Sequence, residues 1–488
     1  MRASRNGNIL QNVDWITIGL FIALAIFGWL NIYGASYTFD QTSIFDFSNR
    51  AGKQFVWLLG SLVLGSILLL IDYKTYDVLA YIAYGLMLLL LLATPFLAHD
   101  IKGSMSWISL GPVSIQPAEF AKCVVALAVA KYMGRYEYRL RTWRDMIIPF
   151  ALIGVPALII MVFQKETGSA LVFASFLLVF YRQGMSGYVL WMVVAAVALF
   201  ILSIRFGSVA LPLGIGSVGV LSCMLLLTAV EIYFICKEHR APFQALILTG
   251  SVAVIYGIFL IINIFTPIHF DWVASCVVVV LVIYNIIISL YWRKYMLLIV
   301  AIFSLFCIGY THACDFVFTK VLQPHQRIRI EVLLGMKDDP AGAGYNVNQA
   351  RIAIGSGRFW GKGYLNGTQT KLQFVPEQDT DFIFCTVGEE WGFVGSAAVL
   401  LVYLFFILRL IMMAERQRNT FTRIYAYAVA GIFLFHLMVN VGMVLGLLPV
   451  IGIPLPFFSY GGSSLWGFTL LLFILLRLDA ARMEQLGG

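Results

Sequence analysis

Long apolar runs follow one another along most of the chain, separated by short polar connections. A helix that crosses a membrane needs roughly 20 predominantly apolar residues. By that measure we predict membrane-spanning helices near residues 14–35, 54–72, 77–97, 118–133, 146–163, 168–182, 187–204, 209–235, 242–266, 272–292, 295–313, 386–411, 422–447 and 462–478. The pattern therefore predicts an all-α polytopic integral membrane protein with about fourteen transmembrane helices. We expect a single membrane domain over residues 1–488.

Composition excludes a water-soluble fold of this size. The chain is 61% hydrophobic and 12% charged, with a mean hydropathy of +0.89, whereas a soluble domain has about a quarter of its residues charged. The first apolar run follows Arg2 and Arg5 and lacks the small-residue cleavage site of a signal peptide. We therefore expect this run to be retained as the first helix.

The formal charge of +8 is explained by the positions of the basic residues. With a cytoplasmic N-terminus, the short outer connections contain few basic residues, such as Arg50 and Lys53, and the cytoplasmic connections contain more of them, as the positive-inside rule requires. The cytoplasmic basic residues are Arg135, Arg139, Arg141, Arg144, Arg182, Lys237, Arg240, Arg293, Lys294, Arg416, Arg418 and Arg423. An even number of helices returns the C-terminus to the cytoplasm, so both termini are expected on that side. The basic excess thus reflects topology, and we expect no nucleic-acid partner.

Two connections on the outer side are unusual. One is the short segment 102–117, and the other is the polar stretch 323–385, which is the only long one in the chain. A connection of that length in a compact protein is usually functional. We therefore predict one large extracytoplasmic loop over 323–385 and expect the chemistry of the protein on the outer face.

Charged residues and glycines are concentrated in this loop. Arg327 and Arg329 form a cationic pair near Asp338 and Asp339, and repeated glycines permit close backbone approach to a ligand. The two aspartates precede a proline, so they are either functional or simple turn formers. The later acidic group consists of Glu377, Asp379, Asp381, Glu389 and Glu390. Its members are either functional or favourable charges near a helix start.

Ionisable residues inside predicted membrane helices are costly and are therefore functional candidates. Glu119 and Lys122 are three positions apart, which places them on one helical face, either as a functional pair or as a structural ion pair. Glu166 lies at an outer helix junction and is also compatible with a helix-start anion. His436 and Asn440 share a face, and a buried polar contact between helices is the favoured interpretation for them.

Five motifs, spread from about residue 100 to residue 465, resemble those of the shape, elongation, division and sporulation (SEDS) proteins. Three lie in or after the large loop: DDPAGAGYNVNQARIAIGSG, GKGYLNGTQTKLQFVPEQDTDFIF and GEEWGFVG. The other two are QPAEFAK at 116–122 and LLPVIGIPLPFFSYGGSSL at 447–465. The details of GTQTKLQFVPE and GIPLPFFSYGG are more similar to the elongation branch of the family than to the division branch.

This resemblance implies a peptidoglycan glycosyltransferase that polymerises lipid II into glycan strands during cell elongation and cell-shape maintenance. It implies that Asp339 is the catalytic general base of an inverting single displacement. It also implies that Glu119 and Lys122 are the family's paired residues in the fourth helix. The candidate substrate-binding residues are Glu119, Lys122, Glu166, Arg327, Arg329, Gln349, Lys362 and Glu377.

Several features depart from the family pattern. Glu166 stands where the family usually has Asp, and Ser106 replaces an Arg. The chain is also longer, with an apolar region over 206–313 between the seventh helix and the large loop. We interpret this region as a four-helix insertion into a SEDS core formed by residues 1–205 and 314–488.

The resemblance further implies cofactors, partners and location. We expect a divalent cation (Mg²⁺ or Mn²⁺), whose ligands the sequence does not identify. The expected partners are lipid II, a class B penicillin-binding transpeptidase and the elongation machinery. The expected location is the bacterial cytoplasmic (inner) membrane. Three other functions remain open: a lipid-precursor flippase or transporter, a non-catalytic scaffold for the transpeptidase, and an unrelated lipid-dependent sugar polymerase.

Overall fold

The computed structural model describes residues 9–37, 44–98, 104–111, 113–135, 138, 143–207, 209–210, 216–239, 242–266, 269–293, 295–316, 318, 320, 322, 324–337, 342 and 344–483. These residues are largely α-helical and contain one two-stranded sheet. They divide into two compact units, one formed by residues 1–185 and 345–488, and the other by residues 186–344. We call them unit 1 and unit 2 and describe each by itself.

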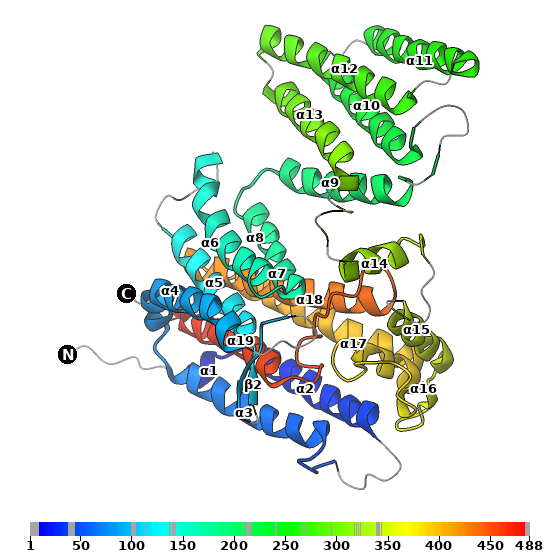
Figure 1. Ribbon diagram of the computed structural model, residues 1–488. Coiled ribbons are helices and arrows are strands. Elements are labelled where there is room, and N and C mark those ends of the chain that lie inside the picture. Colours follow the sequence, from blue (N-terminus) through cyan, green and yellow to red (C-terminus); the bar gives the residue numbers. More distant parts are fainter. Residues whose placement is uncertain are drawn as a thin grey trace, which may run out of the picture. The chain divides into compact units, whose positions relative to one another are not determined.

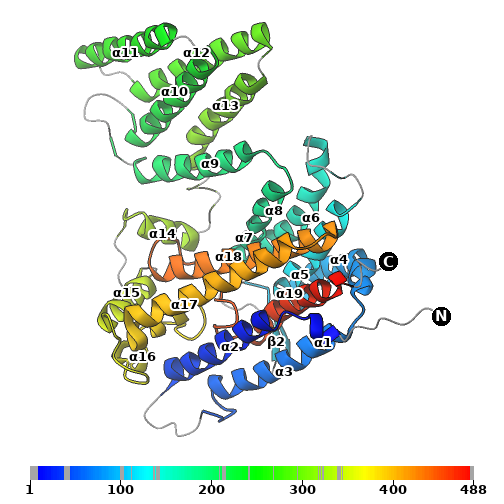
Figure 2. The same cartoon turned by 180° about the vertical axis from the view of Figure 1, so that it is seen from behind.

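Unit 1 contains both ends of the chain. Its first half comprises α1 (Ile9–Asn12), α2 (Trp15–Ser36), α3 (Arg50–Leu70), α4 (Tyr73–Leu97), β1 (Ile108–Leu110), β2 (Val113–Ile115), α5 (Pro117–Met133), α6 (Trp143–Val162), α7 (Thr167–Val172), η1 (Phe173–Ser175) and α8 (Phe176–Arg182). Its second half comprises α15 (Tyr345–Gly357), α16 (Thr368–Lys371), α17 (Ile383–Glu415), α18 (Thr420–Val444), α19 (Gly462–Ala480) and η3 (Ala481–Met483). Neighbouring pairs include α3 with α19, α17 with α18, α2 with α17, and α5 with α4, α18 and α19 (Figure 1, Figure 2).

Unit 2 comprises α9 (Gly187–Arg205), α10 (Val218–His239), α11 (Pro242–Phe265), α12 (Phe270–Trp292), α13 (Tyr295–Phe316) and α14 (Pro324–Leu333). Helix α10 contacts α9, α11, α12 and α13 (Figure 1). An apolar core that includes Leu199, Met224, Val278 and Ala301 joins α9, α10, α12 and α13. The predicted insertion 206–313 lies within unit 2, and its boundaries stay a prediction.

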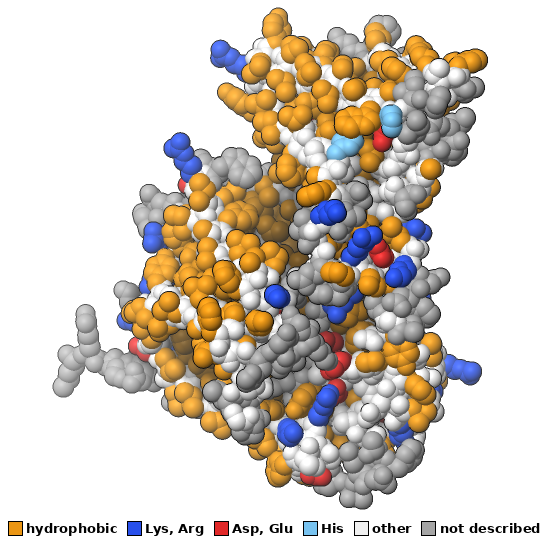
Figure 3. Space-filling model, in the orientation of Figure 1, with side chains coloured by type: hydrophobic (Ala, Val, Ile, Leu, Met, Phe, Trp, Pro, Cys, Tyr) orange, Lys and Arg blue, Asp and Glu red, His pale blue; other side chains and the backbone are white. Residues whose placement is uncertain are grey.

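Eleven helices in the described part of the chain are long and apolar enough to cross a membrane. Hydrophobic side chains also cover much of the visible surface of each unit, as expected for residues that face lipid (Figure 3). The prediction of an all-α polytopic membrane protein is therefore confirmed. Three other predicted spans correspond to apolar helices that are shorter than these eleven. Helix α5 has 17 residues. The helix over Thr167–Arg182 is interrupted by η1, and the apolar part of α11 is Ile247–Asn263. The total of about fourteen spans stays a prediction.

Helix α19 lies at the centre of unit 1. Within its apolar span 83% of the residues are buried, compared with 17% for α4. Gly467 allows α19 to approach α5 closely, because a Cβ atom at this position would lie 3.0 Å from the backbone oxygen of Glu119. Helices α5 and α19 are therefore in close contact near Glu119.

The stretch predicted as a long loop contains regular structure. Helices α14, α15 and α16 and the first residues of α17 all lie within 323–385. Helix α15 packs closely against α17, since a Cβ atom at Gly357 would lie 2.0 Å from the backbone oxygen of Gly388. The short segment 102–117 contains the antiparallel pair of β1 and β2, in which Ile108 is opposite Ile115.

Candidate active site

The predicted pair on α5 forms a buried ion pair. Gln116 is the N-cap of α5, and Pro117 follows at the first helical position, where its missing N–H has no cost. Glu119 is therefore in the first turn, and Lys122 lies one turn later. Lys122 Nζ is 2.8 Å from Glu119 Oε2, and the two residues are 1% and 2% exposed, respectively. The predicted contact is thus present, while a role in substrate binding stays a prediction.

Lys122 has a further partner that local spacing does not reveal. Its Nζ lies 3.0 Å from Nε2 of His436 on α18, and Nδ1 of His436 lies 3.0 Å from the backbone oxygen of Pro454. A charged lysine only donates, so Nε2 accepts and Nδ1 carries the proton that is donated to Pro454. The Phe468 ring lies 4.9 Å from Lys122 Nζ. This arrangement connects α5 with α18, α19 and the segment between them.

Asn440 makes buried polar contacts, with segments next to the helices and not with another helix as the sequence favours. Its Nδ2 donates to the backbone oxygens of Asp381 and Ile453, each at 2.8 Å. The beginning of α17 and the segment before α19 are thereby held against α18. His436 therefore makes a contact between helices, with Lys122 on α5, whereas Asn440 contacts the segments that precede α17 and α19.

Glu166 joins the same region of unit 1. Its Oε1 accepts hydrogen bonds from Nε2 of Gln116, the N-cap of α5, and from Ser169 Oγ at 2.8 Å. Burial raises the pKa of Glu166, and the nearby charge of Glu119 raises it further, whereas hydrogen bonds from Ser106 and Ser169 act in the opposite direction. Glu166 is thus a buried carboxylate close to the Glu119–Lys122 pair. Its role toward substrate stays a prediction.

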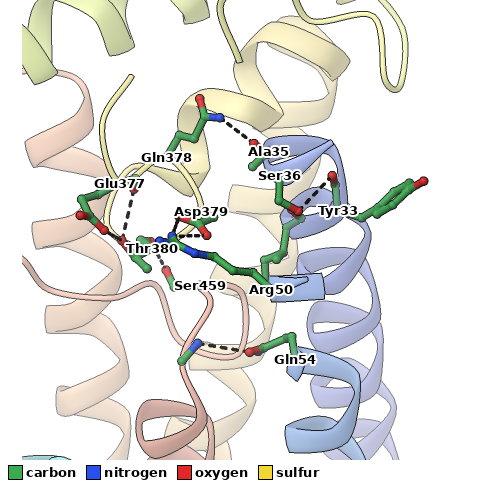
Figure 4. Close-up of polar contacts among 12 residues, drawn as sticks. Tyr33, Ala35, Ser36, Arg50, Gln54, Glu377, Gln378, Asp379, Thr380 and Ser459 are labelled. Atoms are coloured by element: carbon green, nitrogen blue, oxygen red, sulfur yellow. Dashed lines mark hydrogen bonds and ion pairs between the residues drawn. The ribbon is translucent and has the colours of Figure 1, made fainter. Parts of the chain in front are cut away.

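Arg50 is a site residue that sequence reasoning assigned only to topology. Figure 4 shows its side chain reaching from the start of α3 to Asp379, where Nη1 lies 2.6 Å from Oδ1 and 2.5 Å from Oδ2. Asp379 is 4% exposed, and the Arg50 guanidinium lies 5.8 Å from the centre of the Tyr460 ring. The Arg50 side chain is half exposed, so part of its guanidinium faces the surroundings.

Residues next to Asp379 fix the same segment on both sides. Gln378 Nε2 donates to the backbone oxygen of Ala35 at 2.6 Å, and Ser459 Oγ donates to the backbone oxygen of Thr380 at 2.6 Å (Figure 4). Gln378 Nε2 also donates to the backbone oxygen of Thr370 at 2.7 Å. The candidate Glu377 accepts from the Thr380 hydroxyl at 3.2 Å. The PEQDTD motif is thereby held between α2 and the segment that precedes α19.

Glu389 organises the loop between α15 and α16. Its carboxylate accepts from Lys362 Nζ at 2.6 Å and from the backbone N–H groups of Thr368 at 2.8 Å, Gln369 at 2.9 Å and Thr370 at 2.9 Å. Glu389 is fully buried. The candidate Lys362 is therefore held in an ion pair, with its side chain 26% exposed. Contact between Lys362 and a substrate phosphate stays a prediction.

The remaining candidates lie on other elements. Gln349 is half-buried on α15 in unit 1. Arg327 and Arg329 are on α14 in unit 2, where Arg327 Nε lies 2.7 Å from Glu331 Oε1. The catalytic candidate Asp339 and its neighbour Asp338 lie outside the described residues.

The polar residues described above thus form two clusters in unit 1. One contains Glu119, Lys122, Glu166 and His436, and the other contains Arg50 and Asp379. The sequence does not reveal Arg50 as a member of the second cluster, Gln116 as a contact of Glu166, or Ser459 as a contact of Thr380. Gln116 had a usable signal, because it is the first residue of the QPAEFAK motif.

Comparison with known families gives a match over most of the chain. The model of the FTSW_RODA_SPOVE family, described as cell cycle proteins, matches residues 14–211 and 269–484. The unmatched residues 212–268 contain α10 and α11.

Two curated proteins show the extent of the similarity. The chain is 30% identical over 477 residues to the peptidoglycan glycosyltransferase RodA of Treponema pallidum, which covers 97% of this chain and 99% of that protein. It is 48% identical over 145 residues to the peptidoglycan glycosyltransferase MrdB of Escherichia coli K12, which covers 30% of this chain and 39% of that protein.

Two solved structures have a similar fold. The RodA structure from Thermus thermophilus has a TM-score of 0.51 and 20% identity, and the similarity covers 96% of this chain and 97% of that one. A chain from a structure described as "Structural coordination of polymerization and crosslinking by a peptidoglycan synthase complex" has a TM-score of 0.58 and 22% identity, over 96% and 98%. At these identities the two structures show the fold.

Proposed function

This chain belongs to the FTSW_RODA_SPOVE family of cell cycle proteins, and from that premise we propose that it is a peptidoglycan glycosyltransferase that polymerises lipid II. The main support for the proposal is the similarity to the Treponema pallidum glycosyltransferase over 97% of this chain. The buried polar centre of unit 1, built around Glu119 and Lys122, adds support, because charged residues inside a membrane protein are energetically costly and usually mark a functional site.

The proposed reaction is an inverting displacement at the anomeric carbon of the donor sugar. Lipid II presents this sugar on a polyprenyl pyrophosphate, which leaves without protonation by a second acid. Asp339 would remove the proton from the acceptor hydroxyl as that oxygen attacks. An ordinary aspartate is ionised at neutral pH and is therefore ready to accept this proton.

We propose that a divalent cation and basic side chains neutralise the negative charge of the pyrophosphate. Mg²⁺ commonly uses one or two carboxylates together with substrate phosphates and water, so a preformed cage is not required. The described residues contain no group of three or more His, Cys, Asp or Glu side chains that could hold a metal. Arg327, Arg329 and Lys362 are the candidate phosphate contacts.

We further propose that the protein works in the bacterial cytoplasmic membrane beside a class B penicillin-binding transpeptidase, as part of the elongation machinery. A synthase complex that coordinates polymerisation with crosslinking has a chain of the same fold. The full-length relative carries the name of the elongation enzyme, RodA. Both observations support a partner that crosslinks the strands made by this chain.

The test is strand synthesis by the purified full-length chain. Fluorescent lipid II is supplied with Mg²⁺ or Mn²⁺, with and without the transpeptidase, and the products are separated by length. We expect glycan strands that depend on the protein. Transfer of lipid II across vesicles without any strands, in the presence of metal and partner, would instead identify a transporter.

A further inference from the structure

Unit 2 contains a buried carboxylate that the proposed reaction does not use. Glu231 lies on α10, in the stretch that the family model leaves unmatched. Asn285 on α12 and Ser304 on α13 lie beside it. Each of the three is well inside its helix, and each is completely buried. The cluster therefore lies in the interior of unit 2, between three apolar helices.

The contacts within this cluster are incomplete. Asn285 Nδ2 donates to Glu231 Oε2 at 2.6 Å. Glu231 Oε1 and Asn285 Oδ1 are buried and have no hydrogen-bond partner among the described residues, and the buried Ser304 Oγ lies beside the Glu231 carboxylate. None of the ion pairs found in the described part of the chain includes Glu231.

This combination differs from ordinary polar contact between membrane helices. Polar side chains that serve only to join helices hydrogen-bond to each other across the interface. Here a carboxylate lacks a counter-charge in an apolar interior, where an unpaired charge is strongly unfavourable. Glu231 Oε1, Asn285 Oδ1 and Ser304 Oγ are all oxygens with lone pairs, which are the ligands that hard cations prefer.

We propose that Glu231, Asn285 and Ser304 bind a small monovalent cation of the size of Na⁺ inside unit 2. One carboxylate neutralises one positive charge, so a monovalent ion leaves the buried site neutral. A divalent ion would leave an excess charge, and calcium sites normally supply 6–8 oxygen ligands. Backbone oxygens or water would complete the coordination shell. The site is independent of the glycosyltransferase proposal, because it uses none of the residues assigned to that reaction.

The test is direct binding of ²²Na⁺ to the purified full-length chain in nanodiscs of neutral lipid. We expect saturable binding of one Na⁺ per chain. Glu231→Gln keeps the shape of the side chain and removes its charge, so saturable binding should disappear. Ser304→Ala and Asn285→Ala each remove one neutral ligand and should weaken binding about tenfold or more. Asp271→Asn is the matched control, because Asp271 is a carboxylate in the first turn of α12 that is only half-buried. This variant should bind as the wild type does.

Thermal unfolding provides a second readout. At equal ionic strength, NaCl should raise the Tm of the wild type relative to N-methyl-D-glucamine chloride, and Glu231→Gln should abolish this difference. If Glu231→Gln does not fold, unchanged Na⁺ affinity in both Ser304→Ala and Asn285→Ala would overturn the proposal. Absence of saturable Na⁺ binding in the wild type would also overturn it. A Tm that depends on pH and not on Na⁺ would identify a proton as the occupant and reject the cation site.

Discussion

Lys122 on α5 lies 3.0 Å from the Nε2 atom of His436 on α18, although the two residues are 314 positions apart. The histidine accepts this hydrogen bond in its neutral form and donates through Nδ1 to Pro454. Glu119 is the carboxylate that forms the ion pair with Lys122. The N-terminal end of α5 is thereby tied to α18 and to the segment before α19, and disturbance of one partner should reach the others.

The first prediction concerns the buried pair. Lys122→Met leaves Glu119 as an unpaired buried charge, which should cost about 3–5 kcal/mol in the free energy of unfolding. Glu119→Leu alone should have a similar effect, and the double variant should cost less than the sum of the two. Denaturant unfolding in detergent measures the cycle. Strictly additive effects would mean that the two side chains do not interact.

The second prediction concerns Glu389. Glu389→Gln removes the charge that pairs with Lys362 and places an amide near N–H groups that already donate to this position. Each donor left unsatisfied should cost about 1–3 kcal/mol. Hydrogen exchange at the amides of Thr368, Gln369 and Thr370 should therefore accelerate. Glu377→Gln, in the neighbouring motif, serves as the control and should leave exchange at these amides unchanged. Equal exchange in wild type and Glu389→Gln would show that the carboxylate does not organise this loop.

The third prediction concerns pH. Burial raises the pKa of Glu166 above its ordinary value of 4.5, so the folded state binds this proton more tightly than the unfolded state. The resulting stabilisation is fully present below the unfolded pKa and is lost as the pH rises through the folded pKa. Glu166→Gln stays neutral and retains an acceptor for Gln116. The Tm of Glu166→Gln minus that of the wild type should therefore increase as the pH is raised from about 4. A Tm difference that is constant with pH would contradict the assignment.

The fourth prediction concerns Arg50. Arg50→Ala leaves the buried Asp379 without its ion-pair partner, at a cost of about 1–3 kcal/mol for the unsatisfied group. Strand synthesis should fall, because the segment around Asp379 precedes α17 and contacts Tyr460 through its backbone at 2.9 Å. Lys53→Ala, near the same end of α3, is a control that removes an equal charge and should have little effect. Equal strand synthesis by Arg50→Ala and wild type would show that Arg50 has no role in the active site.

The sequence predicts the positions of the helices well, because a membrane-spanning helix is recognised from the hydropathy of its own consecutive residues. It does not predict the 3₁₀ turn at Phe173–Ser175 that interrupts the helix over 167–182, or the pairing of β1 with β2. The apolar pattern does not change at the 3₁₀ turn, and the strand pair is a local hairpin whose strands are only 3 residues long.

The same distinction applies to the site. Glu119 and Lys122 are predicted as a contact because helical geometry brings residues three positions apart together. His436 is not predicted as their partner, because that contact depends on how α5 packs against α18. Arg50 and Asp379 are 329 positions apart, and in sequence Arg50 is only a basic residue before an apolar run. The role of Asp339 rests on family resemblance, since this residue lies outside the described residues.

The most direct test of the glycosyltransferase account is strand synthesis from lipid II by purified Asp339→Asn, with Asp338→Asn as the matched control. Asparagine keeps the size of the side chain and removes the base, whose contribution is typically about 10²–10⁴-fold. We predict that the rate falls by about that factor in Asp339→Asn, with expression and transpeptidase binding unchanged, and that Asp338→Asn is much less affected. Near-normal strand synthesis by Asp339→Asn would contradict the mechanism, and loss in Asp338→Asn alone would assign the base to the other carboxylate.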